Sequence, residues 1–227
     1  MVATRAFSAS QVRTVAPGMI LVGPVARQMQ ALILLGAIDG RRLTPAGRFG
    51  AGWRDLRTQR LFFDASRGNL AAIGTLHALG TTIDPHLHVS VAMPGTSSHG
   101  DSTRVDVLFN GRNATGADIA WMASHNWDHE FGAADQNHFR WTGTMSGAVA
   151  TRTRNRVVAH FLNTRHLGRS TAADQDGDWP ERSNMGWLLQ TLGHEDGLYP
   201  TPKYTIDGIR GPRTTWLRDH YFEQLIG

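Results

Sequence analysis

Residues 94–107, PGTSSHGDSTRVDV, place one histidine and one aspartate seven positions apart, among small residues that build no core. Apolar side chains alternate from Val105 to Phe109, which predicts a strand with one buried face. Imidazole and carboxylate are metal donors, and His99 and Asp106 lie before and within this strand. Two donors make a weak site, so this interpretation requires a third donor elsewhere in the chain.

A second short strand supplies that donor. Residues 135–141, DQNHFRW, alternate polar and apolar side chains, so His138 can approach His99 and Asp106 from a neighbouring strand. Two nitrogens, one oxygen and a position left to water describe catalytic zinc, which lowers the pKa of bound water toward ~7. Asp135 stands three residues before His138 and is placed to take the proton from that water. These are the parts of a metallohydrolase.

The amino-acid composition limits the classes of metal site and of binding partner that we expect. The chain has no cysteine, which removes thiolate zinc sites and suits a reducing cytosol. The formal net charge is +4, which favours an anionic partner such as nucleic acid, a lipid surface or an anionic cell wall. Arginine blocks and an aromatic-and-basic pattern are absent, so we expect no nucleic acid. Arg27, Gln28 and Gln30 interrupt the apolar run 19–36, so we expect neither a spanning helix nor a signal peptide.

The remaining pattern predicts helices around this centre and beyond it. An amphipathic helix is expected over 25–38, ending at Asp39-Gly40, and another after Asp55 as its N-cap. A third is expected to begin at Asp118. From about Arg152 the sequence turns polar, which we interpret as an interdomain connection. Two helical segments follow, with Trp187 and Trp216 expected in their shared core.

At this point the motifs resemble a known family. Two stretches, GTSSHGDSTRVDV and DQNHFRW, resemble the VanY-type D-alanyl-D-alanine carboxypeptidases, a family of zinc peptidases that includes phage endolysins. Its patterns run S-x-H-x-x-G-x-A-x-D and E-x-x-H, and a third, G-Y-R-S-x-x-x-Q, is matched by GWRDLRTQ. The matching positions, spread over about residues 25–145, are Ser97, His99, Asp106, Asp135, His138, Gly52, Arg54 and Gln59.

The resemblance implies roles for these positions. Zn²⁺ would be held by His99, Asp106 and His138, with Asp135 as the catalytic base. Arg54 would bind a substrate carboxylate, as a guanidinium fork can, and Gln59 and Ser97 would also line the substrate site. The sequence departs from the pattern where Ser102 replaces glycine, Arg104 replaces alanine, and Asp135 replaces glutamate.

The C-terminal part resembles peptidoglycan-binding domains through DGDWPERSNMGWLLQTLG and YTIDGIRGPRTTWL. We therefore expect an α+β zinc peptidase domain over 1–150, with a small antiparallel sheet and flanking helices. A linker over 151–164 and a small helical domain over 165–227 would follow. Tethering an enzyme beside a polymeric substrate raises its effective concentration, which gives such a module a purpose.

The functional expectation is a zinc metallopeptidase of the endolysin kind. It would cut peptidoglycan stem peptides at L-Ala-D-Glu or at a bond involving D-Ala, and the sequence does not choose between them. We expect a monomer without membrane insertion, made in a host cytoplasm without a signal peptide and acting at the wall after release. The alternative is a non-catalytic wall-binding or virion structural protein that retains the peptidase fold.

We expect the other polar clusters of the sequence not to bind metal. His86 and His88 lie two positions apart as on one face of a strand, but we expect solvent-facing or packed side chains. The segment 125–130, HNWDHE, is interpreted as a polar helix end. The segment 174–178, DQDGD, lacks the bidentate glutamate of a calcium loop, since the twelfth position is Met185.

Overall fold

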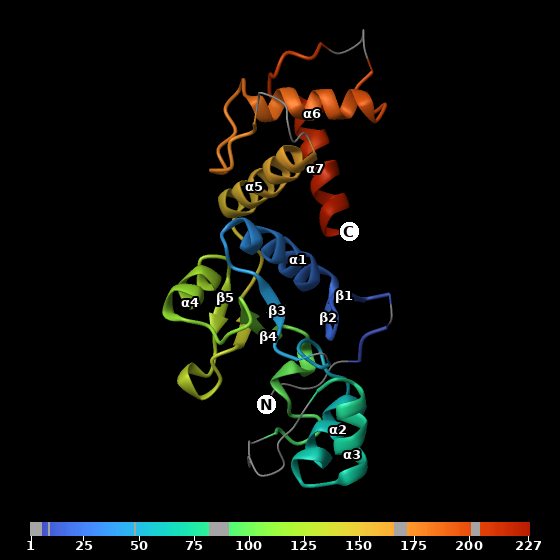
Figure 1. Cartoon of the computed structure of the whole chain (residues 1–227). Helices are drawn as coiled ribbons and strands as arrows, with labels where there is room; N and C mark the ends of the chain where they lie inside the picture. Colours follow the sequence, from blue (N-terminus) through green and yellow to red (C-terminus); the bar gives the residue numbers. More distant parts are fainter. Residues whose placement is uncertain (1–5, 9, 48, 82–90, 166–171, 201–204) are drawn as a thin grey trace. The chain divides into compact units, whose positions relative to one another are not determined.

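The computed structural model describes residues 6–8, 10–47, 49–81, 91–165, 172–200 and 205–227. The chain divides into two compact units, one of residues 1–33 and 40–144 and the other of residues 34–39 and 145–227. Helices and small antiparallel sheets are both present, which confirms the α+β class (Figure 1). Within the described ranges, every helix is too short or too polar to span a bilayer. His86 and His88 lie outside the described residues.

The first unit is built on two antiparallel sheets. One is a two-stranded hairpin of β1 and β2, and the other has four strands in the order β3-β4-β6-β5. The bounds of the strands are β1 Val12–Ala16, β2 Met19–Val22, β3 Leu43–Pro45, β4 Arg104–Phe109, β5 Trp127–His129 and β6 His138–Trp141.

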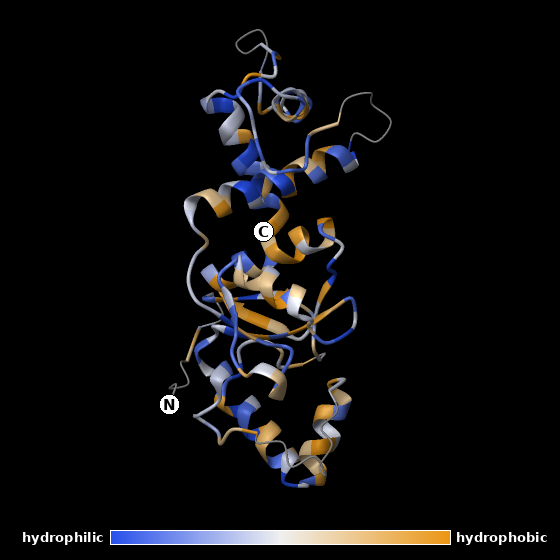
Figure 2. Cartoon of the chain, turned by 90° about the vertical axis from the view of Figure 1, so that its left-hand side faces the viewer, coloured by the Kyte–Doolittle hydropathy of each residue, from blue (hydrophilic) through white to orange (hydrophobic). Residues whose placement is uncertain are grey.

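Strand β4 has the alternation that its sequence predicts. Val105, Val107 and Phe109 are fully buried, and Phe109 meets Phe139 of β6 edge-on at a ring-centre distance of 5.8 Å. Because side chains alternate along a strand, Asp106 projects to the opposite face from these residues. Orange, hydrophobic stretches lie next to blue, hydrophilic ones in this unit (Figure 2). The apolar face therefore anchors the strand and leaves the polar face for the site.

Helices of this unit begin and end where local capping dictates. Their bounds are α1 Gly23–Ile38, α2 Leu56–Ser66, α3 Leu70–Ala78 and α4 Gly116–Ala123, with two 3₁₀ turns, η1 Ser98–Asp101 and η2 Gly132–Ala134. Asp55 caps α2 as predicted, since its Oδ1 accepts the Thr58 amide at 2.6 Å. The predicted start of α4 was wrong, because Thr115 is the N-cap and Asp118 completes its capping box.

Besides the end of α1 from Leu34, the described residues of the second unit form the helices α5 Gly147–Arg165, α6 Asn184–Glu195 and α7 Pro212–Ile226. The segment 151–164, expected to be a linker, lies inside α5. Buried Val157, Val158 and Leu162 share one side of this helix, and the arginines before them concealed that stripe in the sequence. Leu188 and Leu217 are fully buried, but Trp187 and Trp216 are 36% and 41% exposed, so their predicted place in the core was wrong.

A buried amide fixes the turn before α7. The side-chain oxygen of Gln190 accepts the backbone amides of Asp207 and Gly208 at 2.9 and 2.8 Å. Gly208 has φ +74°, a conformation that side chains other than glycine resist. A Cβ at Gly186 of α6 would also collide with the Gly208 carbonyl. Close packing of α6 against the turn therefore explains why Gly186 and Gly208 are glycines.

Candidate metal centre

Three side chains from separate segments converge in the first unit. His99 lies in η1, Asp106 in β4 and His138 at the start of β6, and Asp106 and His138 are directly paired across the sheet. One nitrogen or oxygen of each lies within 4.8 Å of the others, and among the described residues this is the group that could hold a metal ion. The structure thus brings together the three donors that the sequence singled out.

Their spacing suits a small ion. His99 Nε2 lies 3.3 Å from Asp106 Oδ2, and His138 Nδ1 lies 2.9 Å from Asp106 Oδ1. The two imidazole rings are nearly perpendicular, with centres 4.8 Å apart. Zinc bonds of about 2.0–2.2 Å at tetrahedral angles separate donor atoms by roughly 3.3–3.6 Å. The two distances to Asp106 lie at or below this range, and because the donor set as a whole lies within 4.8 Å, its widest separation closes by up to about 1 Å around an ion.

The far nitrogens of both rings face acceptors. His99 Nδ1 lies 2.9 Å from the carbonyl oxygen of Gly52, and His138 Nε2 lies 3.3 Å from Glu130 Oε2. A carbonyl or a carboxylate can only accept, so the acceptors behind the rings can hold a hydrogen on each far nitrogen, which leaves each near nitrogen to donate its lone pair when an ion binds. In that form two lone pairs and a carboxylate converge on the position of the ion. That is the electrostatic environment of a cation site.

Gly52 holds its carbonyl in place by close approach. A Cβ at this position would lie 2.5 Å from the backbone oxygen of Ile20, which also accepts the Trp53 amide at 2.7 Å. Only glycine fits against that strand. The glycine of the third motif therefore has a physical role, which is to place the hydrogen-bond acceptor of His99.

The charges of the centre favour its metal-binding protonation states. Burial would raise the pKa of Asp106, but the charge of His99, hydrogen bonds from His138 and His99, and Arg54 together lower it. Burial lowers the pKa of His99 despite the opposing attraction of Asp106. Near neutral pH the carboxylate is ionised and the His99 imidazole is neutral, which are the forms that ligate metals.

Arg54 occupies the wall of the centre. Its Nη2 donates to Asp106 Oδ2 at 2.9 Å, its Nε donates to the Gly50 carbonyl at 2.5 Å, and its guanidinium lies 4.7 Å from the Phe62 ring centre. Part of the Arg54 guanidinium, which was expected to bind a substrate carboxylate, therefore binds Asp106, a candidate metal ligand. Its side chain keeps 18% exposure and lines the cavity beside the three donors.

A cavity of about 490 Å³ opens over the donors. Asp135 stands at its edge, 48% exposed, with Oδ2 3.9 Å from His138 Nδ1. Ser97 and Gln59 also line it, but both serve the backbone: Ser97 accepts the His99 amide at 3.3 Å, and Gln59 links Arg54 to Gly95. These polar groups order the cavity walls, and the exposed Asp135 carboxylate, whose Oδ1 accepts the Asn137 amide at 3.4 Å, is open to a substrate.

The departures from the family motif fit without disturbing the donors. Ser102 takes the left-handed conformation, with φ +63°, and its hydroxyl accepts the Val22 amide at 2.8 Å. Arg104 is buried and forms ion pairs with Asp101 and Glu130. The bulk that replaces glycine and alanine is therefore used in hydrogen bonds and ion pairs.

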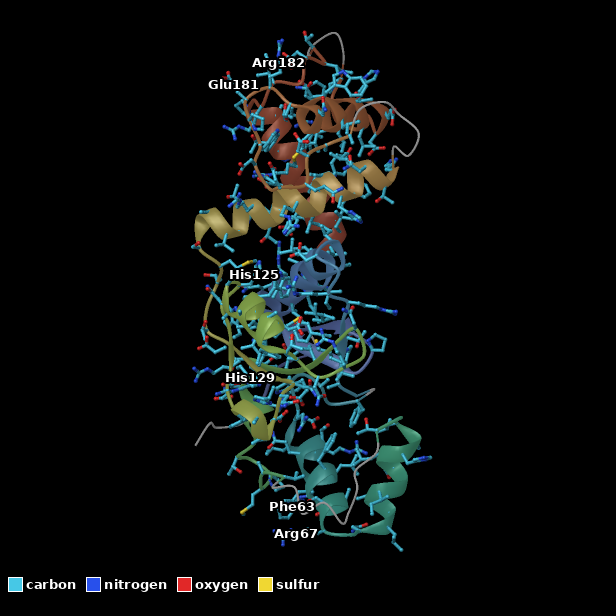
Figure 3. All side chains as sticks on the ribbon, turned by 60° about the vertical axis from the view of Figure 1, so that its left-hand side comes forward. Phe63, Arg67, His125, His129, Glu181 and Arg182 are labelled. Carbon is cyan, nitrogen blue, oxygen red and sulfur yellow. The ribbon has the colours of Figure 1, made fainter. Side chains whose placement is uncertain are left out.

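The segment 125–130 was interpreted incorrectly. The preceding helix ends at Ala123, and Trp127–His129 form strand β5, so the segment is not a helix end. Figure 3 shows His125 and His129 at separate places on the ribbon. His129 Nε2 lies 3.1 Å from the backbone oxygen of Asp135, and Glu130 contacts His138. Sequence reasoning missed Glu130, because no spacing rule connects it with the ligand motifs.

Fold and donor set together define an α+β protein with a His-Asp-His metal centre under an open cavity. Comparisons with protein-family models and with curated proteins found no match. A solved structure of a mutant of the vancomycin-resistance D,D-pentapeptidase VanY, in complex with Zn(II), aligns with a TM-score of 0.42 and 19% identity. That alignment covers 63% of this chain and 87% of the other, and a similarity of this size assigns no family.

Proposed function

We propose that the chain is a zinc-dependent peptidase that hydrolyses peptidoglycan stem peptides, as an endolysin does. The observation that carries the proposal is the convergence of His99, Asp106 and His138, each imidazole oriented by an acceptor behind it. The open cavity above them, with the Arg54 guanidinium and the exposed Asp135 carboxylate at its walls, supports a peptide substrate. The resemblance of the three sequence motifs to peptidoglycan peptidases favours this class of peptide.

The proposed chemistry assigns one task to each group. Zinc bound by the three donors would supply Lewis-acid chemistry, which polarises a scissile carbonyl and activates water. Asp135 accepts the proton of the attacking water and later delivers it to the leaving amine. Its 48% exposure and its 3.9 Å approach to His138 leave it open to both partners. Arg54 offers its guanidinium to a carboxylate of the substrate.

The test is cleavage of purified cell wall. Clearing in a zymogram should disappear with a chelator and return with added zinc, and mass spectrometry of the fragments would name the bond, L-Ala-D-Glu or one involving D-Ala. Asp135→Asn is the matched variant, since it keeps all three donors. Wall binding without clearing, in zinc-loaded protein, would instead support the non-catalytic alternative.

We further propose that the second unit attaches the enzyme to the wall, so that the chain acts there after release from a host cell. A recess of about 460 Å³ supports this, because half-exposed Trp187 and the polar side chains of Arg182, Asn184 and Asp207 line it. An aromatic face beside hydrogen-bonding groups suits a saccharide or a polar peptide. Arg182 is labelled in Figure 3.

Single substitutions test attachment better than a deletion at residue 165, since α5 packs against α6 and α7. Trp187→Ala should lower the amount of protein that sediments with insoluble wall. Trp216→Ala is the control, because Trp216 is similarly exposed on the same unit and stacks on His220 outside the recess. Equal sedimentation of both variants and the parent would contradict the assignment.

A further inference from the structure

Glu130 stands directly behind the candidate ligand His138. It follows strand β5, and its Oε2 lies 3.3 Å from His138 Nε2, on the side of the ring away from Asp106. His138 is 2% exposed and the Glu130 side chain 19% exposed, so little water competes for this contact. The carboxylate is therefore placed to accept a hydrogen from Nε2 when Nδ1, which lies 2.9 Å from Asp106 Oδ1, turns its lone pair to a metal ion.

Arg104 holds Glu130 in that position. Its Nε and Nη2 donate to the two carboxylate oxygens of Glu130, both at 3.1 Å, in the bidentate geometry that fixes a carboxylate plane. Arg104 is 6% exposed and precedes Asp106 by two residues on β4, so the two side chains project from the same face of the strand. The guanidinium thus connects the strand of one donor with the carboxylate behind another.

The same arginine reaches the segment of the third donor. Its Nη1 donates to Asp101 Oδ2 at 2.5 Å, and Asp101 lies in η1 together with His99. Asp101 also accepts the amide and the hydroxyl of Thr103, at 3.0 and 2.7 Å. One buried cation between two carboxylates therefore braces all three donor-bearing segments against one another.

We propose that Glu130 is a positioning residue for the metal centre: clamped by Arg104, it holds the His138 ring with Nδ1 turned toward Asp106 and the metal position, and thereby sets the affinity for zinc. This inference rests on the proposed zinc site but does not require that the chain cleave peptides. Carboxylates that orient a ligating histidine typically change metal affinity by about 10–100-fold.

The experiment measures zinc affinity of the full chain by competition with a chromophoric chelator. Glu130→Ala should weaken zinc binding by about 10–100-fold. The control is Asp128→Asn, two residues earlier on β5, whose carboxylate pairs with exposed Arg140 at 3.4 Å and contacts none of the donors. Zinc affinity in Asp128→Asn should equal that of the parent. An unchanged affinity in folded Glu130→Ala would overturn the inference.

A near-isosteric variant covers the case in which Glu130→Ala fails to fold. Glu130→Gln keeps the volume but turns an amide toward the donors of Arg104. In zinc-loaded protein, where Nδ1 would bind the ion, NMR should then show that the His138 Nε2 hydrogen exchanges with water faster than in the parent. An Nε2 hydrogen that exchanges as slowly in Glu130→Gln as in the parent would contradict the proposal.

The outcomes separate this inference from the proposed function. Tight zinc binding that depends on Glu130, without cleavage of any wall peptide, would end the peptidase proposal and support the positioning role. Cleavage of wall peptides, together with a zinc affinity that does not change in Glu130→Ala, would support the peptidase proposal and end the positioning role. Failure of the parent chain to bind zinc would overturn both.

Discussion

Replacing Gly52 by alanine tests whether backbone close approach organises the metal centre. The new Cβ would lie 2.5 Å from the Ile20 carbonyl oxygen, where real Cβ atoms essentially never come within 3.0 Å. One of the two backbone segments must therefore move by about 0.5 Å. The Gly52 carbonyl moves with it, and its 2.9 Å hydrogen bond to His99 Nδ1 lengthens to about 3.4 Å or bends.

Two consequences have estimable size. Overpacking of this kind costs about 1–3 kcal/mol, and a buried hydrogen bond contributes about 0.5–1.5 kcal/mol. The free energy of unfolding should therefore fall by roughly 2–4 kcal/mol. Zinc affinity should fall by about 10–100-fold, because the His99 ring loses the acceptor that orients it. Urea denaturation followed by tryptophan fluorescence measures the first, and chelator competition measures the second.

Gly74→Ala provides the matched control. Gly74 lies inside exposed helix α3 at a negative φ, with no atom within 4 Å of its added Cβ. This substitution should stabilise the protein by about 0.5–1 kcal/mol and leave zinc affinity unchanged. A Gly52→Ala protein with the stability and zinc affinity of the parent would refute the reasoning about close approach.

Three further perturbations follow from the site and the fold. Asp135→Asn should lower kcat by about 10²–10⁴-fold while zinc affinity holds, and a parallel loss of zinc would show instead that Asp135 is a ligand. Arg54→Lys keeps the positive charge but loses the planar guanidinium, so KM should rise more for a peptide with a free carboxylate than for the corresponding amide. Equal increases in KM for the two peptides would show that Arg54 serves only to hold Asp106. The pKa of Asp118 is lowered, because hydrogen bonds from Thr115 and the charge of Arg112 outweigh burial. Its stabilisation is thus present above the unfolded pKa of ~3.9 and lost as pH falls through the lower folded value. Asp118→Asn should cost about 1–3 kcal/mol at pH 7 and much less near pH 3 in urea denaturation; an equal cost at both would refute the assignment.

Local patterns predicted the donor-bearing parts of the fold well. Alternating residues identified β4 and β6, and Asp55 identified the start of α2. These features depend on neighbours in the sequence, so periodicity and capping rules suffice for them. The meeting of His99, Asp106 and His138 could be predicted because motif spacing reports long-range pairing indirectly.

Features that depend on tertiary partners escaped the sequence. Glu130 becomes part of the site only because β5 pairs with β6, which brings it behind His138. The helical course of 151–164 was concealed by arginines whose charges are met elsewhere: Arg156, for example, pairs with Asp39 at 2.5 Å. Trp187 lies one position from buried Leu188, and one residue on a helix turns a side chain by about 100°. The hydrophobicity of a tryptophan therefore does not predict on which face of the helix its side chain lies.

The direct pairing of Asp106 with His138 has a consequence for how the folded state is maintained. These two residues are 32 positions apart along the chain, and an ion shared between them would close that span like a removable cross-link. In the chain-entropy account, closing a loop of this length is worth about 3–4 kcal/mol. Stripping the ion should therefore speed amide hydrogen exchange within residues 107–137 before the hairpin of β1 and β2 responds, which makes metal occupancy a regulator of local unfolding and of susceptibility to proteolysis.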